Sequence, residues 1–172
     1  MRTIVLFCAI AMLAVGAVMA GPPATTADQL LQRYYSVHKS LASDSINGIA
    51  ASIAEMARIS RQAAVTETQG RTQLIAISDV VAKFDTADLK SARNGFGDLS
   101  DKLIAYLKAA GSKTNPPYQF YCSMVKKNWL QPDKATRNPY MGASMPTCGE
   151  LVQPGNVMEP QMEQPMGTGR RQ

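Results

Sequence analysis

The stretch LKSARNGFGDLSDKLIAY, residues 89–106, is the part of the sequence that indicates the fold most directly. Its apolar side chains recur at intervals of 3, 4, 3, 4 and 3 residues, at Leu89, Ala92, Phe96, Leu99, Leu103 and Tyr106. These intervals are typical of a helix that packs one face into a bundle. Asp85 or Thr86 can cap the start of this helix, and Gly111 can cap its end. Gly95 and Gly97 weaken its middle by roughly 1 kcal/mol each.

Three stretches upstream carry the same helical repeat. The first begins with a capping box at residues 26–29, in which the Thr26 hydroxyl accepts from the amide three residues on and Gln29 reaches back. The three apolar stripes are Leu30, Tyr34, Val37 or His38, and Leu41; Ile46, Ile49, Ile53, Met56 and Ser60; and Leu74, Ile77, Val81 and Phe84. Strand-type alternation is lacking, and no proline stands between Pro23 and Pro116. We therefore predict an all-α fold, a four-helix antiparallel bundle followed by an irregular sulfur-rich C-terminal segment.

The N-terminus has the pattern of a secretory signal peptide. Met1-Arg2 precedes an apolar run over residues 4–20, which closes on Val18-Met19-Ala20. The run is slightly shorter than the roughly 20 residues that span a membrane. We predict cleavage after Ala20, so that residues 1–20, including Cys8, are removed. The mature chain is then exported to the periplasm or secreted, with no further membrane segment.

Beyond the helices the composition changes twice. Residues 112–151 are rich in turns, aromatic side chains and sulfur, and we group them with the helices in one domain over residues 26–151. Residues 152–172 are rich in Pro, Gly, Gln and Met without any aromatic, and we predict that they are disordered. The chain has 18 basic and 13 acidic residues, which are scattered and form no stripe with interleaved aromatics. This pattern argues against a nucleic-acid partner.

The segment MGASMPTCGEL, residues 141–151, concentrates sulfur-containing side chains. Together with YCSM at residues 121–124 it supplies Cys122, Met124, Met141, Met145 and Cys148. Thiolates and thioethers are soft ligands that suit copper(I) or silver(I). A zinc site usually has four Cys, His or carboxylate ligands, and this chain has one histidine. The composition favours copper(I), with the two cysteines as thiolate ligands, Met124 and Met145 as thioether ligands, and Met141 as an auxiliary ligand.

A second interpretation makes the same cysteines structural. After loss of Cys8 only Cys122 and Cys148 remain, and such a pair in an exported protein can form a disulfide. The bond would close a loop of about 27 residues and stabilise the fold by roughly 3–4 kcal/mol. The helices would then form a structural or interaction module that binds no metal. Thiol–disulfide exchange by the same pair ranks third, because the chain has no C-x-x-C motif.

The stretch YCSMVKKNWLQPDKATRNPYMGASMPTCGEL, residues 121–151, resembles a bacterial family of exported proteins whose domain has no known function. The family pattern is roughly Y-C-P-M, then W-L, then N-P-Y-x-G, then M-x-x-C-G. It also occurs appended to the adaptor subunits of heavy-metal efflux pumps. Ser123 stands where the family usually has proline, which leaves the first turn freer.

This resemblance implies a small helical domain with a copper- or silver-related role. Its partner would be a copper efflux component or a cuproprotein, and the activity would be sequestration or hand-over of the metal. The sulfur positions of the pattern fall on Cys122, Met124, Met145 and Cys148. The framework positions fall on Trp129, Asn138, Pro139, Tyr140 and Gly142.

The remaining candidates carry weaker signals. His38 lies near the edge of the first apolar stripe, and such a histidine is more often a partly buried side chain than a metal ligand. Met158, Met162 and Met166 recur every fourth residue, which suits either weak copper(I) binding or an inert tail. We predict no enzyme, because the sequence lacks G-x-S-x-G and H-E-x-x-H, and a cysteine nucleophile would have only His38 as its base.

Overall fold

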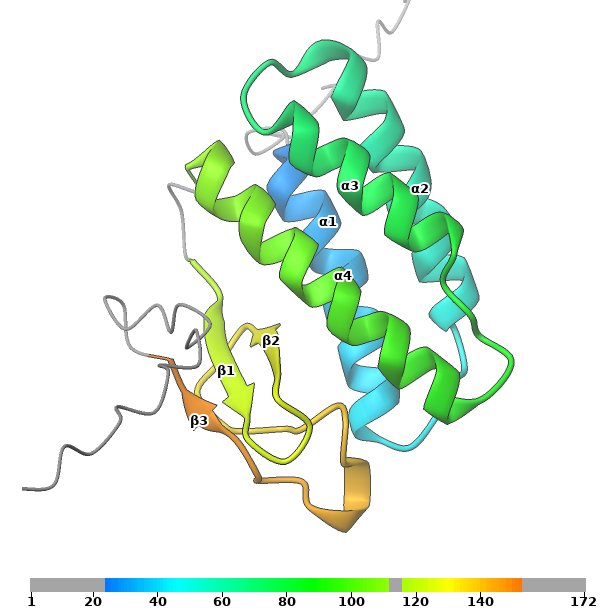
Figure 1. Ribbon diagram of the computed structural model, residues 1–172, viewed down its shortest axis with the longest axis vertical. Helices are drawn as coiled ribbons and strands as arrows, with labels where there is room; N and C mark the ends of the chain where they lie inside the picture. Colours follow the sequence, from blue (N-terminus) through cyan, green and yellow to red (C-terminus); the bar gives the residue numbers. More distant parts are fainter. Residues whose placement is uncertain (1–23, 112–115, 153–172) are drawn as a thin grey trace, which may run out of the picture.

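The computed structural model describes residues 24–111 and 116–152. Within these ranges the chain forms four helices, then strands and one short 3-10 helix: α1 (Thr26–Ala42), α2 (Ile49–Thr66), α3 (Arg71–Ala82), α4 (Leu89–Ala110), β1 (Tyr118–Cys122), β2 (Lys127–Gln131), η1 (Gly142–Ser144) and β3 (Glu150–Leu151). Short connections reverse the chain between successive helices, so that α1 to α4 lie side by side (Figure 1). The predicted signal peptide lies outside the described residues. So does the predicted tail, except Val152, whose backbone N–H donates to the Gln119 carbonyl at 2.8 Å.

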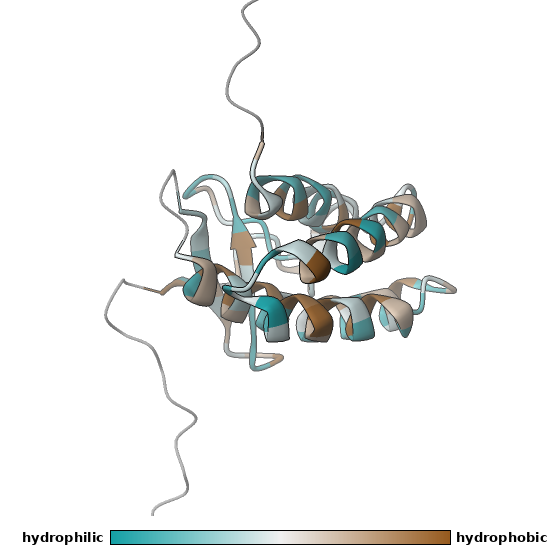
Figure 2. Cartoon of the chain, turned by 90° about the horizontal axis from the view of Figure 1, so that it is seen from above, coloured by the Kyte–Doolittle hydropathy of each residue, from teal (hydrophilic) through white to brown (hydrophobic). Residues whose placement is uncertain are grey.

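The apolar stripes of the helices form the core, as the sequence predicts. In α4 the side chains of Ala92, Phe96, Leu99 and Leu103 are fully buried. Hydrophobic and hydrophilic segments alternate along each helix (Figure 2). Ile46 is an exception, because it lies in the connection before α2 and is 38% exposed.

The helix ends differ from the predicted ones by one to three residues. The capping box of α1 uses Thr25 and Asp28, one position before the predicted pair, and Asp28 N–H donates to Thr25 Oγ1 at 3.2 Å. The cap of α4 is Asp88, whose Oδ1 accepts from Ser91 N–H at 2.8 Å, so the prediction of Asp85 or Thr86 is wrong. Gly111 does end α4, in the left-handed conformation.

The two glycines inside α4 allow neighbouring segments to approach that helix closely. A Cβ atom at Gly97 would lie 2.4 Å from the Lys127 side chain of β2, and one at Gly95 would lie 3.1 Å from the Phe84 ring. Gly97 therefore leaves room for the Lys127 side chain to lie on α4, while the sequence indicates that it weakens the helix.

The prediction of an all-α fold is wrong, because residues 118–151 contain a three-stranded antiparallel sheet in the order β2-β1-β3. The central strand β1 pairs Phe120 with Trp129 of β2 and with Leu151 of β3. Alternation is hidden in β2 because successive residues point to opposite faces of a sheet, and Trp129 and Leu130 are both buried. The β1–β2 turn has no glycine, and Lys126 adopts the left-handed conformation instead (φ 55°). The usual hairpin signal is therefore missing.

A buried hydrogen-bond network joins the sheet to the helices. The Tyr34 hydroxyl of α1 lies 2.7 Å from the Ser100 hydroxyl of α4 and accepts from Leu130 N–H of β2 at 3.1 Å. The Ser100 hydroxyl in turn donates to the Phe96 carbonyl at 2.7 Å. Burial is the main cause that raises the pKa of Tyr34 above its usual value, so the hydroxyl stays protonated and can donate. The position of β2 on α1 and α4 is thus fixed by directional bonds as well as by packing.

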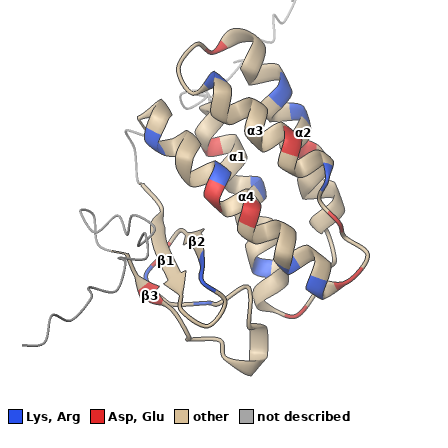
Figure 3. Cartoon of the chain, viewed as in Figure 1, with Lys and Arg blue, Asp and Glu red and all other residues tan. Residues whose placement is uncertain are grey.

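The surface is mixed in charge. Lys and Arg are interspersed with Asp and Glu over the helices and their connections (Figure 3). Among the residues that the structure describes, no helix is both long and apolar enough to cross a membrane.

Candidate functional site

The sheet brings together two cysteines that are far apart in the sequence. Cys122 ends β1 and is fully buried, whereas Cys148 lies two residues before β3 and is partly exposed. The pairing of Tyr121 with Glu150 places the end of β1 beside the start of β3. Both cysteines are free. Burial raises the pKa of the Cys148 thiol, and the adjacent Cys122 thiol raises it further, which favours the protonated form.

Asn138 connects the two cysteines. Its side chain is fully buried, and its Nδ2 donates to Cys122 Sγ at 3.3 Å and to the Cys148 carbonyl at 2.5 Å. Its Oδ1 accepts from the backbone N–H groups of Tyr140 (2.8 Å) and Met141 (3.1 Å). One amide group therefore holds the end of β1, the segment before β3 and the turn at residues 138–141 in one arrangement.

Aromatic rings surround this point. The Trp129 ring stacks on Phe120 with centroids 5.2 Å apart and meets Tyr140 edge-on at 6.1 Å. Trp129 Nε1 donates to Gln131 Oε1 at 3.0 Å, and Gln131 Nε2 donates to two loop carbonyls. A Cβ atom at Gly149 would lie only 2.2 Å from the Trp129 ring, so the chain beside Cys148 packs directly on the indole. The predicted framework residue Trp129 therefore packs against the segment that carries Cys148, and Tyr140 packs against Trp129.

A second set of contacts joins the loop at residues 139–143 to the helices. Arg93 of α4 donates from Nε to the Pro139 carbonyl at 2.9 Å and forms an ion pair with Asp44 at 2.5 Å. Asp44 Oδ2 accepts from Ala143 N–H at 2.9 Å. That bond and the Arg93 guanidinium hold the pKa of the Asp44 carboxyl below its usual value. Gly142 adopts φ 54°, and a Cβ atom there would lie 2.0 Å from Asp44 Oδ1. The framework glycine of the sequence pattern is thus required by the closeness of this ion pair.

Neither Arg93 nor Asp44 was singled out from the sequence, and neither was Gln131. Each has at least one hydrogen bond to a backbone group of residues 133–143, and Arg93 and Asp44 are 49 residues apart in the chain. No local spacing indicates such a pair. Gln131 lies two positions after Trp129 on β2, and its sequence neighbours do not show whether its side chain is buried or exposed.

The methionines of the sulfur segment do not share the burial of Cys122. Met124 lies in the β1–β2 turn and is 63% exposed, and Met145 is 40% exposed. Met141 is half-buried and packs against the core. The structure therefore brings together Cys122 and Cys148 and leaves Met124 and Met145 at the surface.

In the described parts of the chain no group of three or more His, Cys, Asp and Glu side chains is placed to hold a metal ion. A zinc-type site built from these residue types would need such a group. The donors that the described residues do bring together are the two thiols. They match the low coordination number and the soft ligands that copper(I) and silver(I) accept.

His38 is buried in α1, and its Nε2 lies 2.8 Å from the Arg137 carbonyl. Because a carbonyl oxygen can only accept, Nε2 carries the hydrogen of the neutral ring. Burial lowers the pKa of His38 to about 4, and the Arg137 charge contributes to the decrease, while the bond to the Arg137 carbonyl and the Asp133 carboxylate oppose it. His38 therefore anchors the residue that precedes Asn138.

We expect the free energy of unfolding to fall by about 2–3 kcal/mol between pH 7 and pH 4 because of His38 alone. Its folded pKa is depressed below the unfolded value of 6.5. The unfolded state therefore takes up the proton first, and stability is lost as the pH falls from about 6.5 to about 4. Urea unfolding followed by circular dichroism at several pH values measures this loss.

A matched control is His38→Gln, whose side-chain amide can still donate to the Arg137 carbonyl but does not titrate. His38 is the single histidine of the chain. Loss of the same stability in the variant over pH 6.5 to 4.5 would contradict the assignment, because carboxylates would then account for the whole effect.

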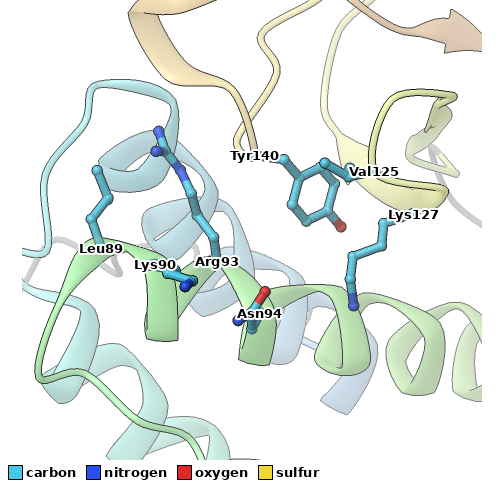
Figure 4. A pocket seen from close by; sticks show the side chains of 7 residues that line it. All are labelled: Leu89, Lys90, Arg93, Asn94, Val125, Lys127 and Tyr140. Atoms are coloured by element: carbon cyan, nitrogen blue, oxygen red, sulfur yellow. The ribbon is translucent and has the colours of Figure 1, made fainter.

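A shallow groove of about 390 Å³ lies between α4 and the β1–β2 turn (Figure 4). Its lining combines three cationic side chains with one amide, one tyrosine and two aliphatic side chains: Leu89, Lys90, Arg93, Asn94, Val125, Lys127 and Tyr140. Arg93 already pairs with Asp44, and Lys127 lies 3.4 Å from Asp98. The lining contains no sulfur, so the groove offers no soft ligand.

Comparisons of the chain with family models, with curated proteins and with solved structures found no match. The interpretation of the site therefore rests on its geometry and on the sequence pattern. The geometry and the sequence pattern involve the same residues, namely the two cysteines and the segment from Asn138 to Gly142.

Proposed function

We propose that this protein binds a soft monovalent metal ion, copper(I) or silver(I), through the thiols of Cys122 and Cys148. The observation that carries the proposal is the convergence of Cys122, at the end of β1, and Cys148, in the segment before β3, on the buried amide of Asn138. A buried amide with hydrogen bonds to both cysteines keeps the ligands close together before the ion arrives. Little ordering of the chain is then needed on binding.

The exposure of the sulfur groups suggests how the ion would arrive. Thioethers bind copper(I) without losing a proton, whereas thiols must deprotonate first. Met124 and Met145 are exposed on turns next to the two cysteines in the sequence. They would make the first contact with the ion, and the thiol pair would then retain it. The proposed role, in an exported protein, is sequestration of the ion or its hand-over to an efflux component or a cuproprotein.

The test is an anaerobic copper(I) competition titration against a coloured chelator, using reduced chain without residues 1–20. We expect uptake of one tightly held equivalent by the unmodified protein. The double variant Cys122→Ser/Cys148→Ser should lose this uptake by at least about a hundredfold in affinity, because hydroxyls are hard ligands. The matched control Met124→Leu/Met145→Leu removes the same number of sulfur atoms at the surface, and should retain most of the affinity. Equal competition by the protein and its cysteine variant would refute the proposal.

A second candidate function follows from the same proximity. A disulfide between Cys122 and Cys148 would clasp the C-terminal segment and leave a structural module that binds no metal. Its formation would stabilise the fold by roughly 3–4 kcal/mol in the chain-entropy model. A thiol count on protein taken directly from its native compartment distinguishes the two. Two reactive thiols per chain favour the metal site, and none favours the clasp.

A further inference from the structure

The two cysteines differ in their access to solvent. Cys122 is fully buried, and its Sγ accepts a hydrogen bond from Asn138 Nδ2. Cys148 is partly exposed and lies in a turn, where its backbone N–H donates to the Met145 carbonyl at 3.2 Å. A reagent in solution can therefore meet Cys148 while Cys122 remains covered. An accessible thiol beside a buried one suits stepwise thiol–disulfide exchange, because access decides which thiol is attacked or attacks first.

We propose that the protein reacts with small-molecule disulfides in a fixed order, in which Cys148 attacks first and Cys122 resolves the product. This activity does not depend on metal binding. It uses the same two sulfur atoms without any ion, and it can succeed or fail whatever the result of the copper(I) titration.

The proposed reaction has two balanced steps. In the first, the Cys148 thiol gives up its proton to solvent and the thiolate attacks one sulfur of the disulfide R–S–S–R. A Cys148–S–S–R bond forms, the S–S bond of the disulfide breaks, and the departing RS⁻ takes up a proton from solvent. In the second, the Cys122 sulfur attacks the Cys148 sulfur and displaces the second RS⁻. The protein loses two protons and two electrons, and the disulfide gains them to become two molecules of R–SH. The oxidant is the small-molecule disulfide itself.

The sheet makes the second step possible without a C-x-x-C motif. In that motif the chain itself keeps two thiols adjacent. Here the β1–β3 pairing places the ends of the two strands together, and Asn138 binds Cys122 Sγ and the Cys148 carbonyl with one amide group. The Asn138 donor also faces the sulfur that must carry negative charge when it attacks. An N–H group directed at a thiolate stabilises that charge.

The order also follows from what surrounds Cys122. The aromatic residues Phe120, Trp129 and Tyr140 are buried around the end of β1. A mixed disulfide at Cys122 would have to place its R group among these rings, whereas one at Cys148 can extend into solvent. A bulky disulfide such as oxidised glutathione is therefore excluded from Cys122 as long as the fold is intact.

The experiment exposes reduced, metal-free protein without residues 1–20 to oxidised glutathione in the presence of a chelator. Samples are quenched with acid and analysed by intact mass and peptide mapping. We expect the unmodified protein to lose two hydrogens and to accumulate little glutathione adduct. Cys122→Ser should accumulate a stable adduct at Cys148. Cys148→Ser should form an adduct at Cys122 at least about tenfold more slowly, because its sulfur is covered.

Three checks keep the result independent of folding defects. The fluorescence of Trp129, the single tryptophan of the chain, shows whether each variant keeps its core. Cys122→Ala serves as a second variant if serine disturbs the buried position. In concentrated urea the two single variants should react at the same rate, since the difference is one of access. Equal rates in the folded state, a difference that persists in urea, or an adduct on the unmodified protein that never resolves would each overturn the proposal.

Discussion

Replacing Asn138 with aspartate is expected to destabilise the protein by about 3–5 kcal/mol at pH 7, as does leaving an uncompensated charge in a core. The side chains have nearly the same shape, but aspartate replaces the donor Nδ2 with an oxygen. That oxygen would face Cys122 Sγ and the Cys148 carbonyl, which accept bonds from Asn138 in the native protein. The other oxygen keeps its bonds from Tyr140 and Met141. The change therefore isolates the contacts with the two cysteines.

The pH dependence of this variant gives a sharper measurement. Burial should raise the pKa of the new carboxyl above its unfolded value of about 3.9. The folded state then retains a proton that the unfolded state releases, so the free energy of unfolding falls as the pH rises above about 4. Urea denaturation at pH 5 and pH 8 should show a larger deficit at pH 8. Asn94→Asp, on the exposed side of α4, is the control and should change stability by less than about 0.5 kcal/mol. Equal deficits for the two variants would mean that the Asn138 contacts are dispensable.

The helices could be predicted because their signal is local. The 3,4 repeat from Ala92 to Leu103 reflects one buried face, and the structure buries that face. The ends of the helices were less predictable. Asp85, Thr86 and Asp88 can all cap a helix by composition, and the choice depends on which carboxylate reaches an amide three residues on.

The sheet could not be predicted by the same approach. Its strands are short, and β2 is buried on both faces, so the period of two that marks a half-exposed strand is absent. The left-handed position in its turn is filled by Lys126, where a glycine or asparagine would have given the signal. Pairing between Phe120 and Leu151 joins residues 31 positions apart, and no local pattern specifies it.

The two cysteines of the candidate site stand out in the sequence, whereas the residues that hold them in place do not. Cysteine is rare enough that Cys122 and Cys148 stand out, and the sequence pattern included Asn138 as framework. The hydrogen bonds of Asn138 to both cysteines depend on the sheet, which the sequence did not reveal. The same applies to Arg93, which reaches the Pro139 carbonyl and the Asp44 carboxylate only because the fold brings these distant residues together.

Gly149→Ala is expected to destabilise the protein by about 2–5 kcal/mol and to separate the two cysteines. The glycine has φ 150°, and an added Cβ atom would lie 2.2 Å from the Trp129 ring. The ring cannot retreat, since it is fully buried, stacked on Phe120 and edge-on to Tyr140. Overpacking costs about 1–3 kcal/mol or more, and a positive φ adds about 1–2 kcal/mol for a residue with a Cβ. The backbone beside Cys148 must therefore move away from the indole.

The control for this prediction is Gly48→Ala, which shares the positive φ (75°) but has no atom within 4 Å of the added Cβ. It should cost only about 1 kcal/mol, so the difference between the variants measures the contact with Trp129. Tryptophan fluorescence reports that contact directly, because Trp129 is the single indole, and its emission should shift to longer wavelength only in Gly149→Ala. Because Gly149 adjoins Cys148, the same variant should also form the Cys122–Cys148 disulfide more slowly than the unmodified protein. Unchanged disulfide formation in a destabilised Gly149→Ala variant would mean that the packing of residues 148–149 on Trp129 does not position the thiol pair.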